Sequence, residues 1–564
     1  MKLKVLVTSG WPYLSVTPHL GNLVGSLLSA DVFARYCRLR SEDVVMVSGS
    51  DEHGTPIEVE AIRLGVSPKE LADKNHALLL GLLEKWGITF DNFTRTESPT
   101  HKQFVKEHLT KIYDNGYIFT KKTEMLYCEK CKRYLPDRFV EGKCPYCGYE
   151  HARGDQCEAC GRLLETTLLL EPYCAICKSK PVVKETEHWY FDLPKFSDRI
   201  RACLEQNKRL PANTRNFSLN LIKEGLKPRA ITRDVSWGIP APFPGAEGKT
   251  IYVWVEAVLG YVSATIEYFK NHDNPEAWKD YWFNKKARTL YFIGKDNIPF
   301  HTIILPALLM ASHEDYNLPW NVAATEFLQF KGEKASKSKK IGIWMHEALE
   351  LFPADYWRYY LIATRPETKD SNFSWGIFIE KINADLNDTF GNFIHRTLTF
   401  ITTQFNSEIP ASQPLDSDSQ AILKSLEEKV ETVAKQLEDC ELQSAITTVI
   451  GIARTGNQYL NEKEPWKLIK TDRTNAASIF HVVAQYVKAL AIVSAPFIPF
   501  SAEEIWKTLN LSGSVHEQWK EALTPLPANH KIGKPKPLFR KIDSDEKELE
   551  ERLQKVRKAL AAAS

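Results

Sequence analysis

Eight of the eleven cysteines lie in four Cys-x-x-Cys pairs within fifty residues, a spacing that suits metal binding. The pairs are Cys128/Cys131, Cys144/Cys147, Cys157/Cys160 and Cys174/Cys177. Two such turns supply the four sulfurs of one tetrahedral Zn²⁺ site, so four turns predict two sites. The alternatives are reduced structural turns or an iron–sulfur cluster, and the even spacing favours zinc. Because four thiolates leave no open coordination position, both ions would be structural.

The cysteine-rich segment also repeats itself. The pattern Cys-x-x-Cys-x-Arg-x-Leu occurs at 128–135 and again at 157–164, 29 residues later. The spacing leaves open which pairs share an ion, because neighbouring pairs could combine or the inner pairs could nest inside the outer ones. Cys37, Cys203 and Cys440 stand alone and are expected to be core or surface residues.

A second kind of chemistry is indicated near the N-terminus, where a strand at 3–8 leads through a turn into a helix. Leucine and valine recur at helical spacing from Leu20 onwards, with Thr17 and Pro18 as the expected N-cap and first-turn residues. His19 and Asn22 then share one face, with Gly21 between them leaving room for a ligand. A helix N-terminus with polar donors suits phosphate binding. The alternative is that His19 caps or packs the helix.

Two further strand ends carry polar residues. GSDEHGTP (49–56) follows the apolar stretch 44–47, and Gly294, Lys295 and Asp296 follow a strand beginning at 289. The carboxyl ends of parallel strands form the ligand edge of an open α/β sheet, where Asp296 could accept from ribose hydroxyls. We therefore expect a doubly wound α/β nucleotide-binding domain interrupted by the cysteine insertion.

The segment KGEKASKSKK (331–340) contains five lysines in ten positions. By itself it is typical of a solvated surface turn, although a mobile loop that meets a polyanion would have the same composition.

Composition and length allow a large protein of several domains. The 564 residues are 43% hydrophobic with a net charge of +2, which does not exclude RNA because phosphate binding depends on where charge lies. No signal peptide is recognisable and no uninterrupted apolar stretch reaches about 20 residues. We expect no membrane association, a cytoplasmic location and reduced cysteines.

The signature segments resemble those of class I aminoacyl-tRNA synthetases. PHLGN (18–22) and KASKS (334–338) are similar to the HIGH and KMSKS signatures, with Asn22 replacing a histidine and Ala335 a methionine. The full collinear set resembles the methionyl-tRNA synthetases. It comprises WPY (11–13), GSDEHGTP (49–56), HWYFDLP (188–194), ITRDVSWGIP (231–240), YVWVEAVLGY (252–261), FIGKDNIPFH (292–301), FLQFKGEKASKS (327–338) and NEKEPW (461–466).

The resemblance implies ATP-dependent activation of L-methionine to methionyl-adenylate and transfer to initiator and elongator tRNA-Met, with Mg²⁺ on the triphosphate. In the family the lysine-rich loop closes over ATP, Lys337 stabilises the departing pyrophosphate and Arg233 braces the loop. Neither departure from the signatures implies loss of activity. The implied catalytic residues are His19, Asn22, Arg233, Lys334 and Lys337. The implied ATP-binding residues are His19, Gly21, Asn22, Gly294, Asp296, Lys334, Ser336 and Lys337.

The resemblance also implies the remaining sites. The methionine pocket would comprise Trp11, Tyr13, Asp51, Trp254, Ala257, Tyr261 and His301, with Asp51 meeting the substrate ammonium. Aromatic walls suit an unbranched thioether. Asn392, Arg396 and Trp466 would read the anticodon. The zinc pairs would be nested, with Cys128, Cys131, Cys174 and Cys177 in site 1 and Cys144, Cys147, Cys157 and Cys160 in site 2.

Six segments are expected along the chain. They are the first half of the Rossmann-like catalytic domain (1–120), the zinc-knuckle insertion (121–227), the second catalytic half (228–330), the KMSKS and stem-contact region (331–378), an all-α anticodon-binding bundle (379–526) and a tail with a final helix (527–564). The C-terminal dimerising domain of many relatives has no counterpart here, so a monomer is expected.

Two other functions fit parts of the sequence. One is a class I synthetase for another amino acid, which the closed Cys₄ sites and the aromatic pocket disfavour. The other is an RNA-binding paralogue without catalysis, which the retained His19, Lys334 and Lys337 disfavour.

Overall fold

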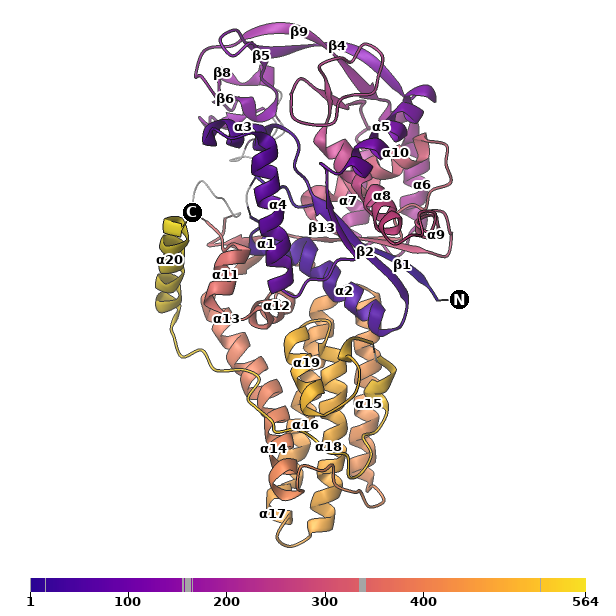
Figure 1. Ribbon diagram of the computed structural model, residues 1–564, viewed down its shortest axis with the longest axis vertical. Coiled ribbons are helices and arrows are strands. Elements are labelled where there is room, and N and C mark those ends of the chain that lie inside the picture. Colours follow the sequence, from indigo (N-terminus) through magenta and orange to yellow (C-terminus); the bar gives the residue numbers. More distant parts are fainter. Residues whose placement is uncertain are drawn as a thin grey trace.

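The structure of the protein is a computed structural model that describes residues 2–15, 17–154, 157, 164, 166–333, 341–517 and 519–563. Figure 1 shows an α/β part, which carries the cysteine insertion at its far end, stacked on a bundle of long helices. The predicted fold class is confirmed.

A parallel sheet lies at the centre of the α/β part. Within the described residues its order is β14-β13-β1-β2-β3. The strands are β1 (Lys4–Ser9), β2 (Asp43–Ser50), β3 (Asn92–Arg95), β13 (Arg288–Gly294) and β14 (Asn321–Thr325). Val7 lies opposite Met46 on one side and Leu290 on the other, and all three are fully buried. Near-continuous apolar runs are what a parallel sheet covered on both faces requires.

The chain reverses its direction of travel across the sheet at β1. It proceeds to β2 and β3 on one side and, after the insertion, to β13 and β14 on the other. In open α/β sheets, ligands bind at such a switch point, beyond the carboxyl ends of the strands. The fold therefore places the expected site just after Ser9 and Gly294.

Helices cover this sheet. The first helix runs without a break through α1 (Leu20–Asn22), the π-helical segment η1 (Leu23–Leu27) and α2 (Leu28–Leu39). The others are α3 (Thr55–Leu64), α4 (Pro68–Lys85), α5 (Pro99–Asp114), α6 (Ser197–Gln206), α7 (Ala212–Lys223), α8 (Val253–Asn271), α9 (Lys279–Trp282) and α10 (Leu305–Ala311), the last preceded by the π-helical segment η6 (Phe300–Ile304).

The insertion projects from the sheet on a long antiparallel hairpin (Figure 1). β4 (Ile118–Cys128) pairs with β9 (Val182–Phe191) along its whole length, from Ile118 opposite Phe191 to Tyr127 opposite Val182. The smaller strands are β5 (Arg133–Tyr134), β6 (Val140–Lys143), β7 (Ala152–Arg153), β8 (Leu170–Cys174), β10 (Arg229–Ala230), β11 (Thr232–Arg233) and β12 (Thr250–Ile251).

The second part is helical. Its elements are α11 (Met345–Leu351), α12 (Ala354–Ala363), α13 (Trp375–Glu380), η7 (Lys381–Gly391), α14 (Asn392–Gln404), α15 (Ser417–Glu438), α16 (Leu442–Lys463), α17 (Pro465–Leu468), α18 (Arg473–Ser494), α19 (Pro499–Thr508) and α20 (Glu546–Ala563), with β15 (Leu328–Phe330) paired to β16 (Ser371–Phe373). α13, η7 and α14 follow one another without a gap, so the boundary expected at 379 lies inside continuous helix.

Helix α18 is the core of the bundle. It is long and apolar enough to span a membrane, but 89% of its most apolar window is buried inside the protein. It packs against α14, α15, α16 and α19, which explains its composition. After α19 the chain runs back along the molecule, and α20 lies beside α11 (Figure 1).

Arg358 on α12 joins the two parts. Its side chain is fully buried and donates to Asp31 Oδ2 on α2 at 2.7 Å, and to the carbonyls of Pro496 and Phe497 at 2.9 Å each. Arg35 lies 2.9 Å from the same Asp31 oxygen. Burial alone would raise the pKa of Asp31, but the two guanidinium groups hold it below its usual value.

Arg358→Met should destabilise the protein by about 3 kcal/mol, because it leaves buried carbonyls and one side of Asp31 without a donor. The measurement is urea unfolding followed by circular dichroism. Lys69→Met, which removes an exposed partner of Asp73, is the control and should cost less than about 1 kcal/mol. Equal effects of the two substitutions would contradict the role assigned to Arg358.

Candidate active site

The carboxyl ends of β1 and β2 are joined beyond the sheet. The Asp51 N–H donates to the Pro12 carbonyl at 3.0 Å, and the Leu14 N–H donates to the Asp51 carbonyl at 3.0 Å. On the other side of β1, the Gly10 N–H donates to the Phe292 carbonyl at 2.8 Å. Residues predicted from three separate motifs therefore meet at one edge of the sheet.

His19 caps the first helix. Its Nδ1 accepts from the backbone N–H of Gly21 at 3.0 Å and of Asn22 at 3.4 Å, while Asn22 Oδ1 accepts from the His19 N–H at 3.2 Å. The expected cap at Thr17 is therefore wrong. The histidine replaces it because its side chain reaches the free amides of the first turn.

The same cap defines the charge of His19. Burial lowers the pKa of the imidazole to about 4, so the ring is neutral at neutral pH. Because Nδ1 accepts, Nε2 carries the proton and can donate to an anion. A capping role and a phosphate-binding role are thus compatible in one residue.

Gly21 makes room for that ring. A Cβ at this position would lie 2.8 Å from His19 Cε1, closer than the atoms can approach. The sequence analysis assigned this space to a ligand, whereas in the structure the imidazole fills it.

The chain on both sides of the lysine-rich segment reaches His19. Phe330 lies edge-on to the imidazole at 6.4 Å between ring centroids, and Trp344 forms a β-bridge with His19. The Leu20 N–H donates to the Ile343 carbonyl at 2.9 Å. Lys334, Ser336 and Lys337, together with Ala335, lie outside the described residues.

The turn after β13 holds Gly294 and Asp296. A Cβ on Gly294 would lie 2.9 Å from Asp296 Oδ1, so glycine lets the carboxylate fold back over the strand end. Lys295 turns elsewhere and pairs with Glu326 at 2.7 Å and Asp370 at 2.6 Å. The predicted ribose contact of Asp296 stays a prediction.

Aromatic rings line the space above the sheet edge. Trp11 fits between two glycines, since a Cβ at Gly49 or Gly260 would approach the indole to 2.7 or 2.5 Å. Tyr261 lies edge-on to Trp11 at 6.4 Å, and its hydroxyl is 2.7 Å from His301 Nε2.

His301 is fixed as a neutral acceptor. Its Nδ1 lies 2.9 Å from the Asn297 carbonyl, to which it donates, so Nε2 accepts from Tyr261. Burial lowers its pKa to about 4. Trp254 and Ala257 lie on the same face of α8 as Tyr261, and Trp254, 36% exposed, stacks on Phe300 at 4.6 Å.

Asp51 is a buried carboxyl group with an unused acceptor. It is 4% exposed, and its Oδ1 has no hydrogen-bond partner among the described residues. Burial, with a contribution from Glu256, raises its pKa well above the usual value. A buried acceptor of this kind is ready for a charged donor from a ligand. Tyr13 lies beside it in a β-bridge and donates to the His53 carbonyl at 2.5 Å.

Sequence reasoning missed four residues around this pocket, namely His53, Glu97, Glu256 and Tyr291. Tyr291 lies edge-on to Tyr261 at 5.2 Å, and the other three form a buried chain of ion pairs. The available signal was Glu256, a charged residue in the middle of an apolar helix pattern.

Arg233 contacts the insertion. Its guanidinium lies 3.8 Å from the centre of the Tyr252 ring, and its Nε is 3.7 Å from Asp137. The structure thus places Arg233 at the start of α8, and its predicted contact with the lysine-rich segment falls on residues that are not described.

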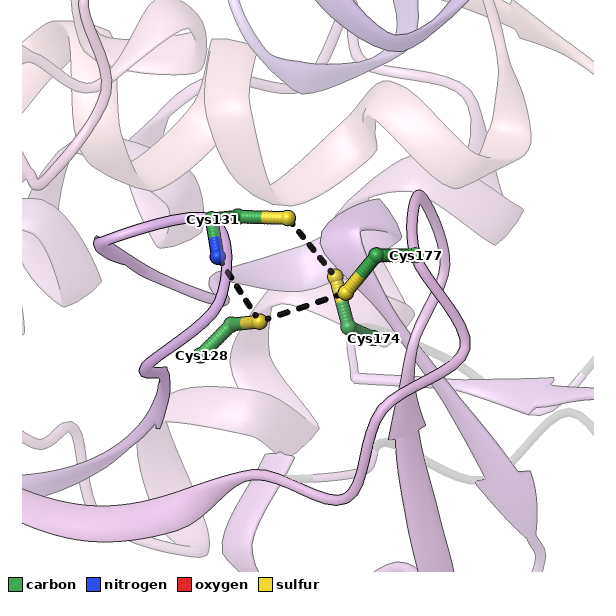
Figure 2. A group of neighbouring side chains, drawn as sticks. All are labelled: Cys128, Cys131, Cys174 and Cys177. Carbon is green, nitrogen blue, oxygen red and sulfur yellow. Dashed lines mark hydrogen bonds between the residues drawn. The ribbon is translucent and has the colours of Figure 1, made fainter.

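The outer cysteine pairs come together (Figure 2). Cys128 Sγ lies 3.4 Å from Cys177 Sγ, and Cys131 Sγ lies 3.9 Å from Cys174 Sγ. A tetrahedron with Zn–S bonds of about 2.3 Å has edges of about 3.8 Å, so the donor set fits Zn²⁺. Ser179 Oγ, 2.9 Å from Cys177 Sγ and 3.2 Å from Cys128 Sγ, can donate to the thiolates and was missed from sequence.

The inner pairs form the second group. The sulfurs of Cys144, Cys147 and Cys157 lie within 4.8 Å of one another, with Cys147 and Cys157 at 3.6 Å. Cys160 lies outside the described residues. The sulfurs are thus grouped in the nested arrangement rather than by neighbouring pairs.

The residues predicted to read the anticodon lie near one another in the helical bundle. Arg396 is 5.6 Å from the centre of the Trp466 ring, and Asn392 lies exposed one helical turn earlier. Asn457 and Asn461, which sequence reasoning missed, accept from the Arg396 guanidinium at 2.9 and 3.1 Å.

Comparisons with known proteins cover almost the entire chain. The family described as tRNA synthetases class I (M) matches residues 5–398, and the anticodon binding domain of methionyl tRNA ligase matches residues 409–558. The methionine–tRNA ligase of Caldivirga maquilingensis is 54% identical over 97% of this chain and 93% of its own. That of Thermofilum pendens is 51% identical over 100% of this chain and 99% of its own.

A solved structure shares the fold. Mycobacterium tuberculosis methionyl-tRNA synthetase in complex with methionyl-adenylate matches with a TM-score of 0.80 and 24% identity, over 96% of this chain and 100% of that chain.

The site at the switch point lies beside a histidine-capped helix, in a chain that matches the class I family over residues 5–398. These features define a class I aminoacyl-tRNA synthetase. Within that class the high identity to relatives over their full length is decisive. The chain belongs to the methionyl-tRNA synthetase family, as the sequence resemblance indicated.

Cys174→Ser should lower the zinc content from about two ions per chain to about one, because a serine hydroxyl is a poor replacement for the fourth thiolate. Zinc is measured by plasma mass spectrometry after dialysis. Cys203→Ser, at a lone half-buried thiol, is the control and should retain both ions. An unchanged zinc content in the Cys174 variant would contradict the assignment of the outer pairs.

Proposed function

We propose that this enzyme joins L-methionine to tRNA-Met, initiator and elongator, in two steps. The methionine carboxylate attacks the α-phosphorus of ATP, forming the mixed anhydride methionyl-adenylate while pyrophosphate leaves with the bonding electrons. A hydroxyl of the terminal adenosine of the tRNA then attacks the acyl carbon, loses its proton and displaces AMP. The observation that carries this proposal is the buried carboxyl of Asp51, whose Oδ1 has no hydrogen-bond partner among the described residues, at the sheet edge that also carries the Trp11–Tyr261 ring contact.

Each part of the methionine molecule has a matching group. Asp51 would accept from the ammonium, and the walls formed by Trp11, Tyr261 and His301 would enclose the thioether. Because His301 is neutral, placing the apolar side chain of methionine against it carries little desolvation cost. Shape then excludes larger side chains, because one methylene in an apolar pocket is worth only about 1–3 kcal/mol.

ATP would lie across the switch point. Asp296 would bind the ribose, while His19 Nε2 and the Asn22 amide would donate to phosphate oxygens at the helix N-terminus. Lys334, Ser336 and Lys337 would meet the β- and γ-phosphates, and Arg233 would brace their loop. Mg²⁺ accompanies the triphosphate and neutralises part of its charge. Catalysis by positioning and electrostatic stabilisation requires no covalent enzyme intermediate.

The zinc sites would be structural, and the bundle would read the anticodon. Trp466 can stack on an unpaired base, while Asn392 and Arg396 hydrogen-bond to base edges. We further propose that the enzyme works as a monomer in the cytosol, where its cysteine thiols stay reduced.

Pyrophosphate exchange across the twenty amino acids tests this function. Methionine alone should support rapid exchange, and Lys337→Ala should reduce the rate by about 10²–10³-fold with methionine binding nearly unchanged, as expected for one lost electrostatic contact in the transition state. Lys340→Ala, in the same segment but outside the signature, is the matched control. Exchange with a different amino acid, or intact exchange in the Lys337 variant, would refute the proposed specificity or the proposed role of the loop.

Trp466→Ala should lower kcat/KM for charging tRNA-Met by about 10–100-fold, because one base–aromatic stack is worth about 1–3 kcal/mol. Amino-acid activation without tRNA should not change. Phe217→Ala, an exposed aromatic of α7 in the α/β part, is the control and should leave both rates alone. A matching loss in pyrophosphate exchange would mean that Trp466 supports the fold rather than the anticodon.

A further inference from the structure

A chain of buried ion pairs lies directly behind Asp51. His53 Nδ1 is 2.9 Å from Glu256 Oε1, and His53 Nε2 is 2.7 Å from Glu97 Oε1. Lys102 continues the chain at 2.5 Å from the same Glu97 oxygen. The side chains of His53 and Glu256 are 1% and 0% exposed, so the interaction between them is little screened by water.

His53 is held as a cation by the groups that face it. Glu256 on α8 and Glu97 after β3 approach its two nitrogens, Asp51 and Glu52 precede it in the chain, and the Trp237 ring lies edge-on at 5.4 Å. The two carboxylates outweigh the desolvation and raise the pKa of His53 to about 10.

Of the other titratable groups near His53, Glu52 is paired with a cation and His101 is neutral. Glu52 pairs with Arg95 at 2.8 Å. His101 lies 2.8 Å from Ser263 Oγ and 3.7 Å from Glu256, and burial lowers its pKa, so the ring is neutral.

The charges leave one group unbalanced. Glu97 forms an ion pair with Lys102, Glu52 with Arg95, and Glu256 with His53. Of the carboxylates that face His53 in the described residues, this leaves Asp51, whose Oδ1 also has no hydrogen-bond partner. Glu267, on the far side of His101, accepts instead from Ser98 and Asn92. A buried negative charge without a partner is costly, so the pocket favours a ligand that brings one positive charge.

We propose that His53 and Glu256 are positioning residues that act as a neutral pair behind Asp51, keeping that carboxylate free for the ammonium group of the amino acid. Glu256 pairs with the His53 imidazolium, which would otherwise pair with Asp51. His53 in turn neutralises the Glu256 carboxylate, which would otherwise repel the Asp51 carboxylate. This inference rests on the proposed function, because it requires Asp51 to meet the substrate ammonium.

The test compares His53→Gln, Glu256→Gln and the double variant in methionine-dependent pyrophosphate exchange. Each single variant should raise KM for methionine at least tenfold at pH 7, with KM for ATP within twofold of the parent. The double variant should recover most of the loss, since two neutral amides restore the single negative charge on Asp51. A role confined to packing predicts the opposite, with the double variant no better than the worse single variant, and that result would overturn the proposal.

The pH dependence of KM gives a second readout. In His53→Gln the two carboxyl groups of Asp51 and Glu256 share one proton, which the ammonium must displace. Because that proton is lost as pH rises, KM for methionine should fall between pH 6 and pH 8. In the parent, His53 balances Glu256, so only the raised pKa of Asp51 itself contributes and KM should fall less steeply than in the variant. A fall in the parent as steep as in the variant, or a flat KM in the variant, would contradict the inference.

Binding measurements cover the case in which a variant folds but exchanges too slowly. Calorimetry with methionine and with 4-(methylthio)butanoate, which lacks the amino group, separates ammonium recognition from thioether recognition. Glu256→Gln should reduce the preference for methionine over this analogue at least tenfold while the analogue binds as before. Equal loss for both ligands would show damage to the pocket, against the proposal. Absence of methionine-dependent exchange in the parent would instead refute the proposed function.

Discussion

The position of β1 between β2 and β13 is the constraint on which the site depends. Parallel pairing on both sides fixes the register of the three strands, so the segments after Ser9, Ser50 and Gly294 emerge at the same height. Trp11 and Asp51 lie 40 residues apart and Asp296 lies 245 residues beyond Asp51, but all three belong to these segments. The apolar runs that build the strands therefore also determine where the polar residues meet.

The cysteine insertion can be accommodated because it enters and leaves through one hairpin. β4 and β9 pair residue by residue, so more than fifty residues between them can form their own core around the cysteine clusters without moving the sheet. The C-terminal helix α20 also holds a distant segment of the chain in place. Arg557 on α20 bonds to Glu347 at 2.8 Å and to the Gly342 carbonyl at 2.5 Å, which fixes the chain segment that pairs with Pro18 and His19. The last helix of the chain thus supports the head of the first.

Sequence patterns predicted the features that depend on neighbouring residues, namely the strands, the helices and the cysteine turns. Short apolar runs identified the strands of the parallel sheet, helical spacing identified the bundle, and Cys-x-x-Cys turns identified the cysteine clusters. Spacing could not tell which cysteine pairs share an ion, because that depends on how β6 and β8 fold the segment back on itself. The cap was predicted at Thr17, with His19 as the alternative, because the sequence pattern does not show which side chain reaches the first-turn amides. The pairs Asp31–Arg358 and His53–Glu256 span more than two hundred residues each, so no local pattern shows which residues pair.

The buried carboxyl groups of Asp31 and Asp51 differ in whether the free protein supplies them with cationic partners. At the domain junction, Asp31 is matched by Arg35 and Arg358, so the charges are balanced in the free protein and the junction is stable without a ligand. At the sheet edge, the ion pairs behind Asp51 are balanced among themselves and leave that one carboxyl unmatched. In the proposed function, the substrate ammonium would supply the positive charge that Asp51 lacks, and the aromatic side chains of Trp11 and Tyr261 would contact the thioether.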